Sequence, residues 1–275
     1  MALPAYFTTS EKISHWALRA FVGLVLLFLI APILAIMPLS FNSETFFSYP
    51  MPGYSTKWYV DFFTNDRWQK ALRLSFVLAF ATTILATTLG TLAALGLSRG
   101  NLPGRASIMA VLISPMIVPV IISALGMFFF YARWRLTGTM AGLILAHTAL
   151  ATPFVVITVT ATLSSFDRTL MRAGASLGAP PHTVFFKVVM PLILPGMISG
   201  ALFAFVTSFD EVVVIIFIAS PEQNTLPRQM FSGIRELISP TITAAATVLI
   251  LFSTAMLVTV EMLRRRSEKL RGVTG

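Results

Sequence analysis

The chain has 275 residues, of which 56% are hydrophobic and only 11% are charged, and it contains no Cys. Globular proteins carry about 25% charged residues. This composition excludes a disulfide framework and a Cys-based metal site, and it argues against disorder and against a water-soluble fold.

Six segments without any charged residue, each between 22 and 31 residues long, make up most of the chain. A helix needs about 20 mostly apolar residues to cross a bilayer, and the two-residue alternation of a β-barrel is absent. The first segment is too long for a signal peptide, so we expect a retained helix. The sequence therefore predicts an all-α membrane protein with six transmembrane helices in a single domain over 1–275. The expected spans are residues 17–39, 72–97, 107–131, 140–164, 193–219 and 241–262.

Two shorter helices are expected in the outer loops. An aromatic-rich outer loop follows the first span, and residues 57–63 within it suit a short helix at the membrane interface. Prolines frame another short helix at about 228–237. Pro115, Pro119 and Pro153 lie inside expected spans, where a proline kinks the helix. Such kinks suit helices that bend around a cavity, but prolines are also common in spanning helices generally.

The basic residues indicate the orientation. The N-terminal arm, loops 99–105 and 167–187 and the tail carry 12 Lys and Arg, against 8 on the opposite side. The positive-inside rule therefore places both termini in the cytoplasm. The net charge of +9 is explained by these anchors and by attraction to anionic lipid, so no nucleic-acid partner is expected.

The cytoplasmic loop at 166–187 carries the most informative pattern. Asp167 suits a helix N-cap, and Gly178 followed by two prolines is a strong helix stop. The residues between them predict a short helix with an apolar stripe formed by Leu170, Ala173, Gly174 and Leu177. Such a helix suits docking into a groove of a partner protein, and it equally suits lying on the lipid interface.

A resemblance to a known family favours docking into a partner protein over lying on the lipid interface. The stretch from Arg172 to Ala179, continued by Phe185 to Pro191, is similar to the E-A-A-x-x-x-G-A loop of permease subunits in binding-protein-dependent ABC importers, and Gly178 matches the Gly of that motif. The resemblance covers nearly the whole chain and implies the fold of a type I ABC importer permease. It implies that this loop is a coupling helix seated in a separate ATPase subunit. Arg172 replaces the Glu of the family motif, so the polar contact of that Glu must here be absent, reversed in charge or made by another group. The coupling residues so implied are Arg168, Leu170, Arg172, Ala173, Gly174, Leu177, Gly178 and Ala179.

Neither ATP hydrolysis nor metal chemistry is expected on this chain. The phosphate-binding pattern G-x-x-x-x-G-K-[ST] does not occur in the sequence. The three histidines fall in separate segments without metal-ligand spacing, and His147 in the fourth span suits a packed or pore-facing polar residue. We therefore expect a transport subunit rather than an enzyme, with no cofactor of its own and with ATP and Mg²⁺ held by the partner ATPase.

Asp210 and Glu211 interrupt the expected fifth span. A carboxylate at membrane depth costs several kcal/mol and usually faces a cavity or a partner. On a continuous helix Asp210 shares a face with aromatic and hydroxyl side chains, a setting that suits an organic cation through charge pairing and cation–π attraction. Pairing with Lys or Arg of a neighbouring helix or subunit is the alternative. The expected pathway residues are Asp210, Glu211, Phe209, Phe203, Thr207 and Phe217.

The same segment resembles the second permease subunit of spermidine/putrescine-type importers, in which an acidic pair is usual at this position. The resemblance implies a polyamine or related amine as substrate. It also implies alternating access, a dimer of ATPase subunits, a second permease subunit and a periplasmic or extracellular binding protein as partners, and a location in the inner membrane. A proton-coupled secondary transporter that uses Asp210 and Glu211 as proton carriers is the alternative, although no inverted repeat is apparent.

Overall fold

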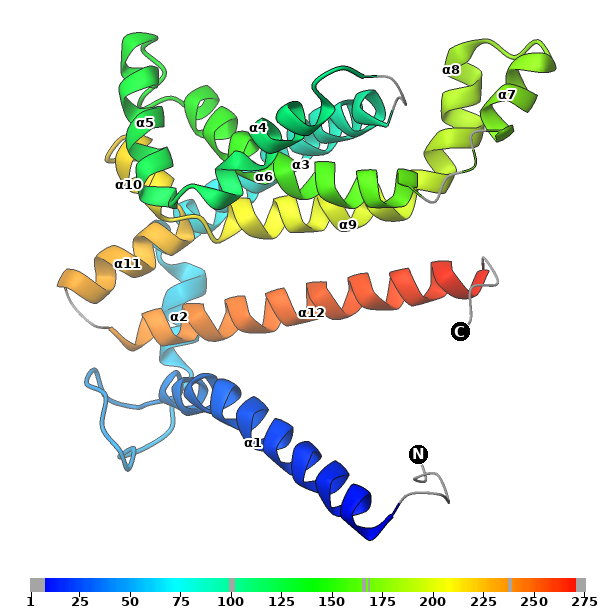
Figure 1. Ribbon diagram of the computed structural model, residues 1–275. Helices are drawn as coiled ribbons and strands as arrows, with labels where there is room; N and C mark the ends of the chain where they lie inside the picture. The colour runs from blue at the N-terminus through cyan, green and yellow to red at the C-terminus, as the bar shows by residue number, and fades with distance from the viewer. Residues whose placement is uncertain (1–7, 99–101, 165–166, 168, 237–238, 271–275) are drawn as a thin grey trace. The chain divides into compact units, whose positions relative to one another are not determined.

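The computed structural model describes residues 8–98, 102–164, 167, 169–236 and 239–270. Within these ranges the regular structure is helical, apart from an isolated bridge between Asn42 and Tyr54. The helices, labelled in Figure 1, are α1 (Thr9–Leu39), α2 (Lys57–Thr64), α3 (Asp66–Leu97), α4 (Arg105–Ile117), α5 (Val120–Arg133), α6 (Met140–Ser164), α7 (Thr169–Ser176), α8 (Pro181–Val184), the π-helix η1 (Phe185–Val189), α9 (Met190–Phe209), α10 (Val213–Ile218), α11 (Leu226–Glu236) and α12 (Pro240–Leu270).

The chain divides into two compact units. The first unit comprises residues 1–63 and 237–250. Its helix α1 has no buried residue and exposes large apolar side chains on all sides, as a helix surrounded by lipid does. The short helix expected at 57–63 is present as α2. The Trp58 indole donates a hydrogen bond to the Asn42 carbonyl (2.6 Å) and the Thr241 hydroxyl donates to the Asp61 carboxylate (2.7 Å).

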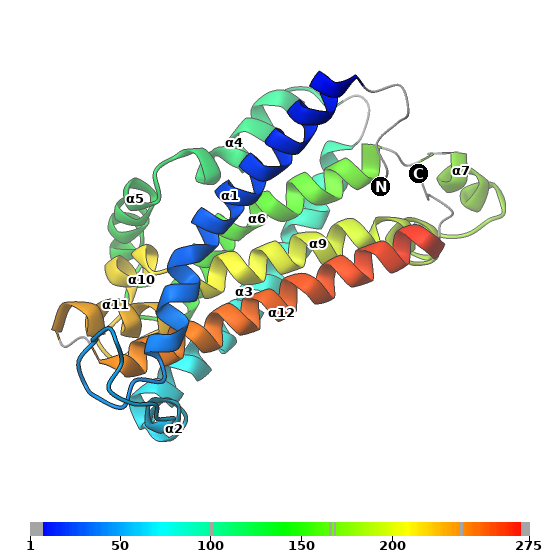
Figure 2. The ribbon, with the colours of Figure 1, turned by 90° about the horizontal axis from the view of Figure 1, so that it is seen from below.

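The second unit comprises residues 64–236 and 251–275 and contains the core of the protein. Helices α3, α6 and α9 pack against one another along their lengths (Figures 1 and 2). Lipid supplies no hydrophobic force between helices, so association depends on close packing by small residues. Glycines stand at close approaches between these helices, where Gly90 of α3 faces Val155 on α6 and Gly200 of α9 faces the same residue.

The third expected span is not one helix. Residues 105–133 form α4 and α5, which are bent by 105° at a short break. Pro119 begins the new direction, and Val118 before it adopts an extended conformation (φ −70°, ψ 132°). A proline lacks the N–H that a continuous helix requires and disfavours helical geometry in the preceding residue. The prediction of a continuous helix over 107–131 is therefore wrong.

The fifth expected span is also interrupted, so the prediction of one helix over 193–219 is wrong. Helix α9 ends at Phe209, Asp210 is its C-cap, and the separate helix α10 begins at Val213. Two adjacent carboxylates fall at this point. The acidic pair thus lies in a turn between helices and not inside a helix.

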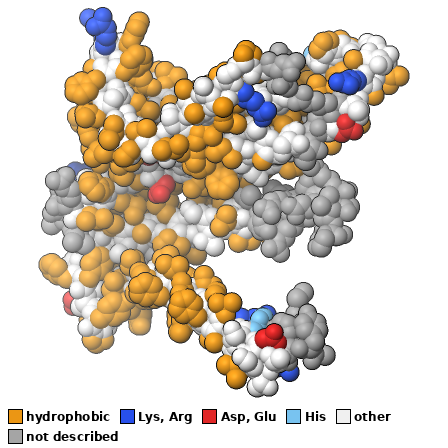
Figure 3. Space-filling view, viewed as in Figure 1, with side chains coloured by type: hydrophobic (Ala, Val, Ile, Leu, Met, Phe, Trp, Pro, Cys, Tyr) orange, Lys and Arg blue, Asp and Glu red, His pale blue; other side chains and the backbone are white. Residues whose placement is uncertain are grey.

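The other spans agree more closely with expectation. The fourth coincides with the helix at residues 140–164, whereas the helices of the first and second begin earlier, at Thr9 and Asp66. Those helices start in polar turns capped by Thr8 and Asn65, upstream of the apolar residues. In the described parts, five helices are long and apolar enough to cross a membrane, or six if the bent α4–α5 pair counts as one span. Hydrophobic side chains cover much of the face shown in Figure 3, as a bilayer requires.

Candidate functional site

The loop between the fourth and fifth spans folds into the expected short helix, α7. Asp167 precedes it, and the hydroxyl and the backbone N–H of Thr169 both donate to its carboxylate (2.7 and 2.9 Å). These two hydrogen bonds lower the pKa of the exposed Asp167 carboxyl. The helix begins two residues beyond Asp167, so this residue supports the first turn from outside the helix. Arg168, one of the expected coupling residues, lies outside the described residues.

The expected helix stop at Gly178 is confirmed. Its φ of +79° lies in the left-handed region, which glycine adopts without the steric penalty that other residues meet. The N–H of Ala179 donates to the carbonyl of Gly174 (3.2 Å), and the N–H of Gly178 donates to that of Ala175 (2.9 Å). These bonds satisfy the last carbonyls of α7, and Pro180 then directs the chain away from the helix.

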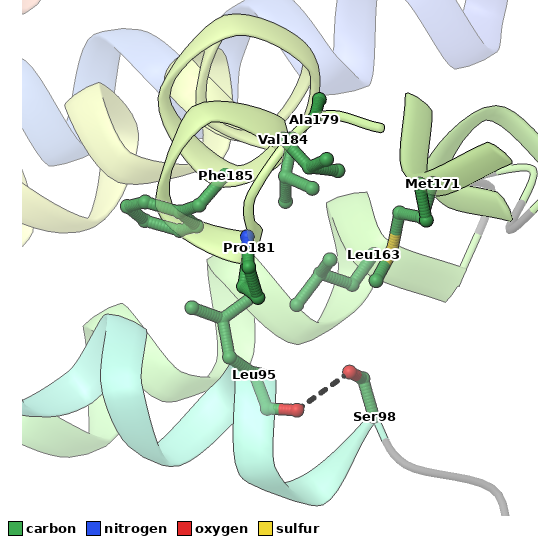
Figure 4. A pocket seen from close by; sticks show the side chains of 10 residues that line it. Leu95, Ser98, Leu163, Met171, Ala179, Pro181, Val184 and Phe185 are labelled. Atoms are coloured by element: carbon green, nitrogen blue, oxygen red, sulfur yellow. Dashed lines mark hydrogen bonds between the residues drawn. The ribbon is translucent and has the colours of Figure 1, made fainter. Parts of the chain in front are cut away.

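The face of α7 that packs inside this chain differs from the expected apolar stripe. A Cβ on Gly174 would lie 3.2 Å from Val184 of α8, so Gly174 faces inward. Met171, Ala175 and Ala179 line a pocket of about 430 Å³ together with the ends of α3 and α6 and with α8 (Figure 4). The packing of α7 on α8 through the missing side chain of Gly174 sets this orientation.

The remaining members of the stripe stay on the surface. Leu177 is 87% exposed, Leu170 is 45% exposed, and Ala173 and Arg172 are also exposed. Isolated exposed apolar residues are common on soluble proteins, but here they form one edge of an exposed helix in a loop. We call Leu170, Ala173 and Leu177 the outer edge of α7, and it is available to a partner.

A π-helix, η1, connects α8 to α9 and was not anticipated from the sequence. The N–H of Met190 donates to the carbonyl of Phe185, five residues earlier. Pro191 has no N–H to offer the carbonyl four residues before it, which favours such a local widening. The two prolines Pro191 and Pro195 near the start of α9 are the signal that could have indicated it.

The turn that follows α9 separates the two acids. Asp210 is exposed, and its backbone N–H donates to the carbonyl of Val206 (3.0 Å). The Glu211 carboxylate instead accepts the N–H of Val214 (2.9 Å) and caps α10. Among the described residues no Lys or Arg forms an ion pair with either carboxylate. Asp210 is thus the more exposed of the two acids, whereas the Glu211 carboxylate is engaged with the backbone of α10.

The aromatic side chains expected around Asp210 are distributed over several sites. Phe203, 52% exposed and stacked on Phe154 at 5.9 Å, and the half-buried Thr207 share the face of α9 that leads to Asp210. Phe209 is buried among other rings, 5.1 Å from Phe76. Phe217 belongs to α10 and packs against a separate hydrophobic cluster. The face that the sequence predicted for Asp210 therefore holds for Phe203 and Thr207 and fails for Phe217, because the helix ends at Phe209.

His147 is the polar residue whose connection the sequence did not reveal. It is buried in α6, and its Nδ1 lies 2.9 Å from the Oγ of Ser208 on α9, two residues before Asp210. The expectation of a packed or pore-facing histidine is resolved as a packed one, since the side chain is 1% exposed.

The described part of the chain is a bundle of apolar helices with a glycine-terminated helix in the loop before its fifth span, and comparison with known families shows the class, that of the membrane components of transport systems. Residues 86–269 match the family described as "Binding-protein-dependent transport system inner membrane component", and the chain belongs to this family. The family and fold class predicted from the sequence are confirmed.

Named relatives are permease proteins. The chain is 32% identical over 258 residues to the spermidine/putrescine transport system permease protein PotC of Haemophilus influenzae, covering 92% of this chain and 99% of the relative. It is 33% identical over 230 residues to the putrescine transport system permease protein PotI of Escherichia coli, covering 81% and 82% of the two chains.

Solved structures share the fold. A chain of a bacterial ABC transporter involved in the import of the acidic polysaccharide alginate aligns with a TM-score of 0.72 at 14% identity, over 95% of this chain and 99% of that one. A chain of the MetNI methionine ABC transporter aligns with a TM-score of 0.57 at 17% identity, over 71% and 94%. The architecture is therefore that of an ABC importer permease.

Proposed function

We propose that this chain is the permease subunit of an ATP-driven importer that moves a polyamine or a related cationic amine inward across the cytoplasmic membrane. The observation that carries the proposal is α7, a glycine-terminated helix whose outer edge (Leu170, Ala173 and Leu177) is exposed while its other face packs on α8. Such an edge fits a groove of a partner protein. The names of PotC and PotI support the substrate class.

The partners follow from what the chain lacks. Its sequence contains no phosphate-binding loop, so ATP and Mg²⁺ belong to a dimer of separate ATPase subunits and this chain is not itself an enzyme. A second permease subunit completes the pathway and a binding protein delivers the substrate at the outer face. The excess of Lys and Arg on the side of α7 supports a cytoplasmic location for that helix and for both termini.

The packing of the second unit suggests how movement of α7 reaches the pathway. Helix α7 packs on α8 through Gly174 and Val184, and α8 continues through η1 into α9. Helix α9 is in close contact with α6 and ends at Phe209, with Asp210 as its C-cap. Displacement of α7 by closure of the ATPase subunits would thus move this connected group of helices. ATP supplies the free energy through contacts that differ between the two states, without chemistry on this chain.

Asp210 is the residue proposed to meet the substrate. Its carboxylate is exposed at the end of the face formed by Phe203 and Thr207. An ammonium group on an amine would form a charge-assisted hydrogen bond with it, and the half-exposed ring of Phe203 offers a cation–π surface on the same face.

The proposal is tested by purifying the chain from its native membrane in a mild detergent. An ATPase subunit is expected to co-elute and to hydrolyse ATP faster when the amine-loaded binding protein is added, whereas the Leu177→Asp variant on the outer edge of α7 is expected to lose that subunit. A matched Leu92→Asn change, which alters an exposed residue on α3 away from this edge, should retain it. A chain that elutes alone, and that transports an amine with a proton gradient as the sole energy source, would establish the secondary-transporter alternative instead.

A further inference from the structure

A single hydrogen bond joins α6 to the last turn of α9 inside the core. The Nδ1 of His147 lies 2.9 Å from the Oγ of Ser208, and the two residues are separated by 61 positions in the sequence. Both side chains are buried, at 1% and 4% exposure. In such surroundings a polar side chain is costly unless it has a hydrogen-bond partner.

Among the described residues, Ser208 is the residue that hydrogen-bonds the His147 ring. A neutral imidazole carries one donor and one acceptor nitrogen. The Nε2 of His147 is buried and has no hydrogen-bond partner among the described residues. The Ser208 hydroxyl is therefore the only side-chain partner that the described residues offer to the ring, and the backbone of Ser208 also forms a hydrogen bond with it. Loss of the hydroxyl would remove the side-chain half of this contact.

The bond lies at the polar end of a close helix–helix contact. Gly196, Gly200, Ala204 and Ser208 follow one another at four-residue spacing along the buried face of α9. A Cβ on Gly200 would lie 2.8 Å from the Cα of Val155 in α6. The glycines fix the distance between the two helices, and the His147–Ser208 bond fixes the rotation of the final turn of α9, because a hydrogen bond is directional.

We propose that His147 is a positioning residue for substrate recognition: through Ser208 it orients the last turn of α9 and thereby sets where the Asp210 carboxylate lies. Asp210 caps the same turn, two residues beyond Ser208. The inference rests on the proposed function in so far as Asp210 meets the amine, but the placement of residue 210 can be measured without any substrate.

The first test measures that placement directly. The native chain has no Cys, so Asp210→Cys introduces a unique thiol on this subunit, whose modification by a small charged methanethiosulfonate is followed in the assembled transporter. Addition of Ser208→Ala or His147→Gln is expected to change the rate of modification by roughly threefold or more. Interhelical hydrogen bonds in membranes contribute about 0.6 kcal/mol on average, which corresponds to a factor of about three at 25 °C. His147→Asn is expected to keep the rate within about twofold, because its amide oxygen can occupy the place of Nδ1 and accept from Ser208. A thiol at the exposed Tyr54 of the outer loop controls for reagent and assembly.

The second test uses the intact Asp210 and measures uptake of putrescine. Ser208→Ala and His147→Gln are expected to raise KM more than they lower kcat, and the double variant is expected to show no larger change than either single one. Ser208→Ala removes one hydroxyl only, so it carries the test if a His147 variant does not assemble. A Ser208→Ala chain with the parent modification rate at position 210 would overturn the positioning role. A changed modification rate in a transporter that moves no amine would uphold the positioning role and refute the proposed substrate.

Discussion

Replacement of Gly200 by alanine tests whether α6 and α9 form one rigid element. The added Cβ would lie 2.6 Å from the Thr158 Oγ1 and 2.8 Å from the Cα of Val155. The hydroxyl can rotate away, but a backbone atom cannot. To restore an ordinary contact of about 3.4 Å, the two helices must separate by about 0.6 Å at this point.

The expected cost follows from this geometry. Overpacking of a tight core typically costs about 1–3 kcal/mol, while alanine gains about 0.5–1 kcal/mol over glycine in a helix. Gly126→Ala in α5 is the matched control, because a Cβ there has no atom within 4 Å. The helix-propensity gain is common to both variants, so the difference between them isolates the overpacking cost. At about 2–4 °C per kcal/mol, the Gly200→Ala variant should melt roughly 2–12 °C below the control.

The assay is thermal unfolding of the detergent-purified transporter, followed by the loss of its monodisperse elution peak after heating. After reconstitution of the same preparation into proteoliposomes, uptake at 25 °C should fall for Gly200→Ala and stay at the parent level for Gly126→Ala. Equal melting temperatures and equal uptake for the two variants would refute the tight contact between α6 and α9 and the rigid connection built on it.

Three further results are expected. Gly178→Val should uncouple ATP hydrolysis from uptake, because a β-branched residue at φ +79° is strained, whereas Gly178→Asn should retain partial coupling; full coupling in the Val variant would contradict the role of the helix stop. Asp210→Asn should raise the KM for a cationic amine without lowering Tm, whereas Glu211→Ala should lower Tm, because it loses a capping hydrogen bond worth about 1 kcal/mol. A lowered Tm for Asp210→Asn together with a raised KM for Glu211→Ala would mean that the two residues have the opposite roles. Asp167→Ala should speed amide exchange in α7, since the hydroxyl and N–H of Thr169 lower the pKa of that carboxyl below its ordinary 3.8. That stabilisation is present above the ordinary pKa and is lost as pH falls through the lowered one. Protection of the α7 amides should therefore be constant between about pH 8 and 6, and a change within that range would refute the role of the Asp167 carboxylate.

The spans could be predicted because a bilayer demands about 20 apolar residues from each. The polar ends of these helices could not be predicted, since the caps at Thr8 and Asn65 extend α1 and α3 beyond the apolar residues. The break at Pro119 was foreseeable as a kink, but not as a bend of 105°. Its angle depends on how α5 packs against α10, which is a tertiary contact that periodicity does not encode.

In the candidate site, too, features set by the local sequence could be predicted, whereas features set by tertiary contacts could not. Gly178 could be identified because a glycine followed by prolines ends a helix by local geometry alone. The inward orientation of Gly174 depends on Val184 of another helix, and the partnership of His147 depends on Ser208, 61 residues away. The break at Asp210 also escaped the helical pattern, because the apolar residues after it fit a continued helix equally well.

The most direct test of the account is the initial rate of putrescine uptake into proteoliposomes that contain this chain with its second permease subunit and ATPase, supplied with the binding protein outside. ATP and Mg²⁺ enclosed with the ATPase are expected to drive uptake, and a proton gradient alone is expected to drive none. Asp210→Asn should reduce the ATP-driven rate at limiting putrescine. Uptake that requires no ATPase, or a rate unaffected by ATP, would contradict the central claim that this permease is powered through its coupling helix.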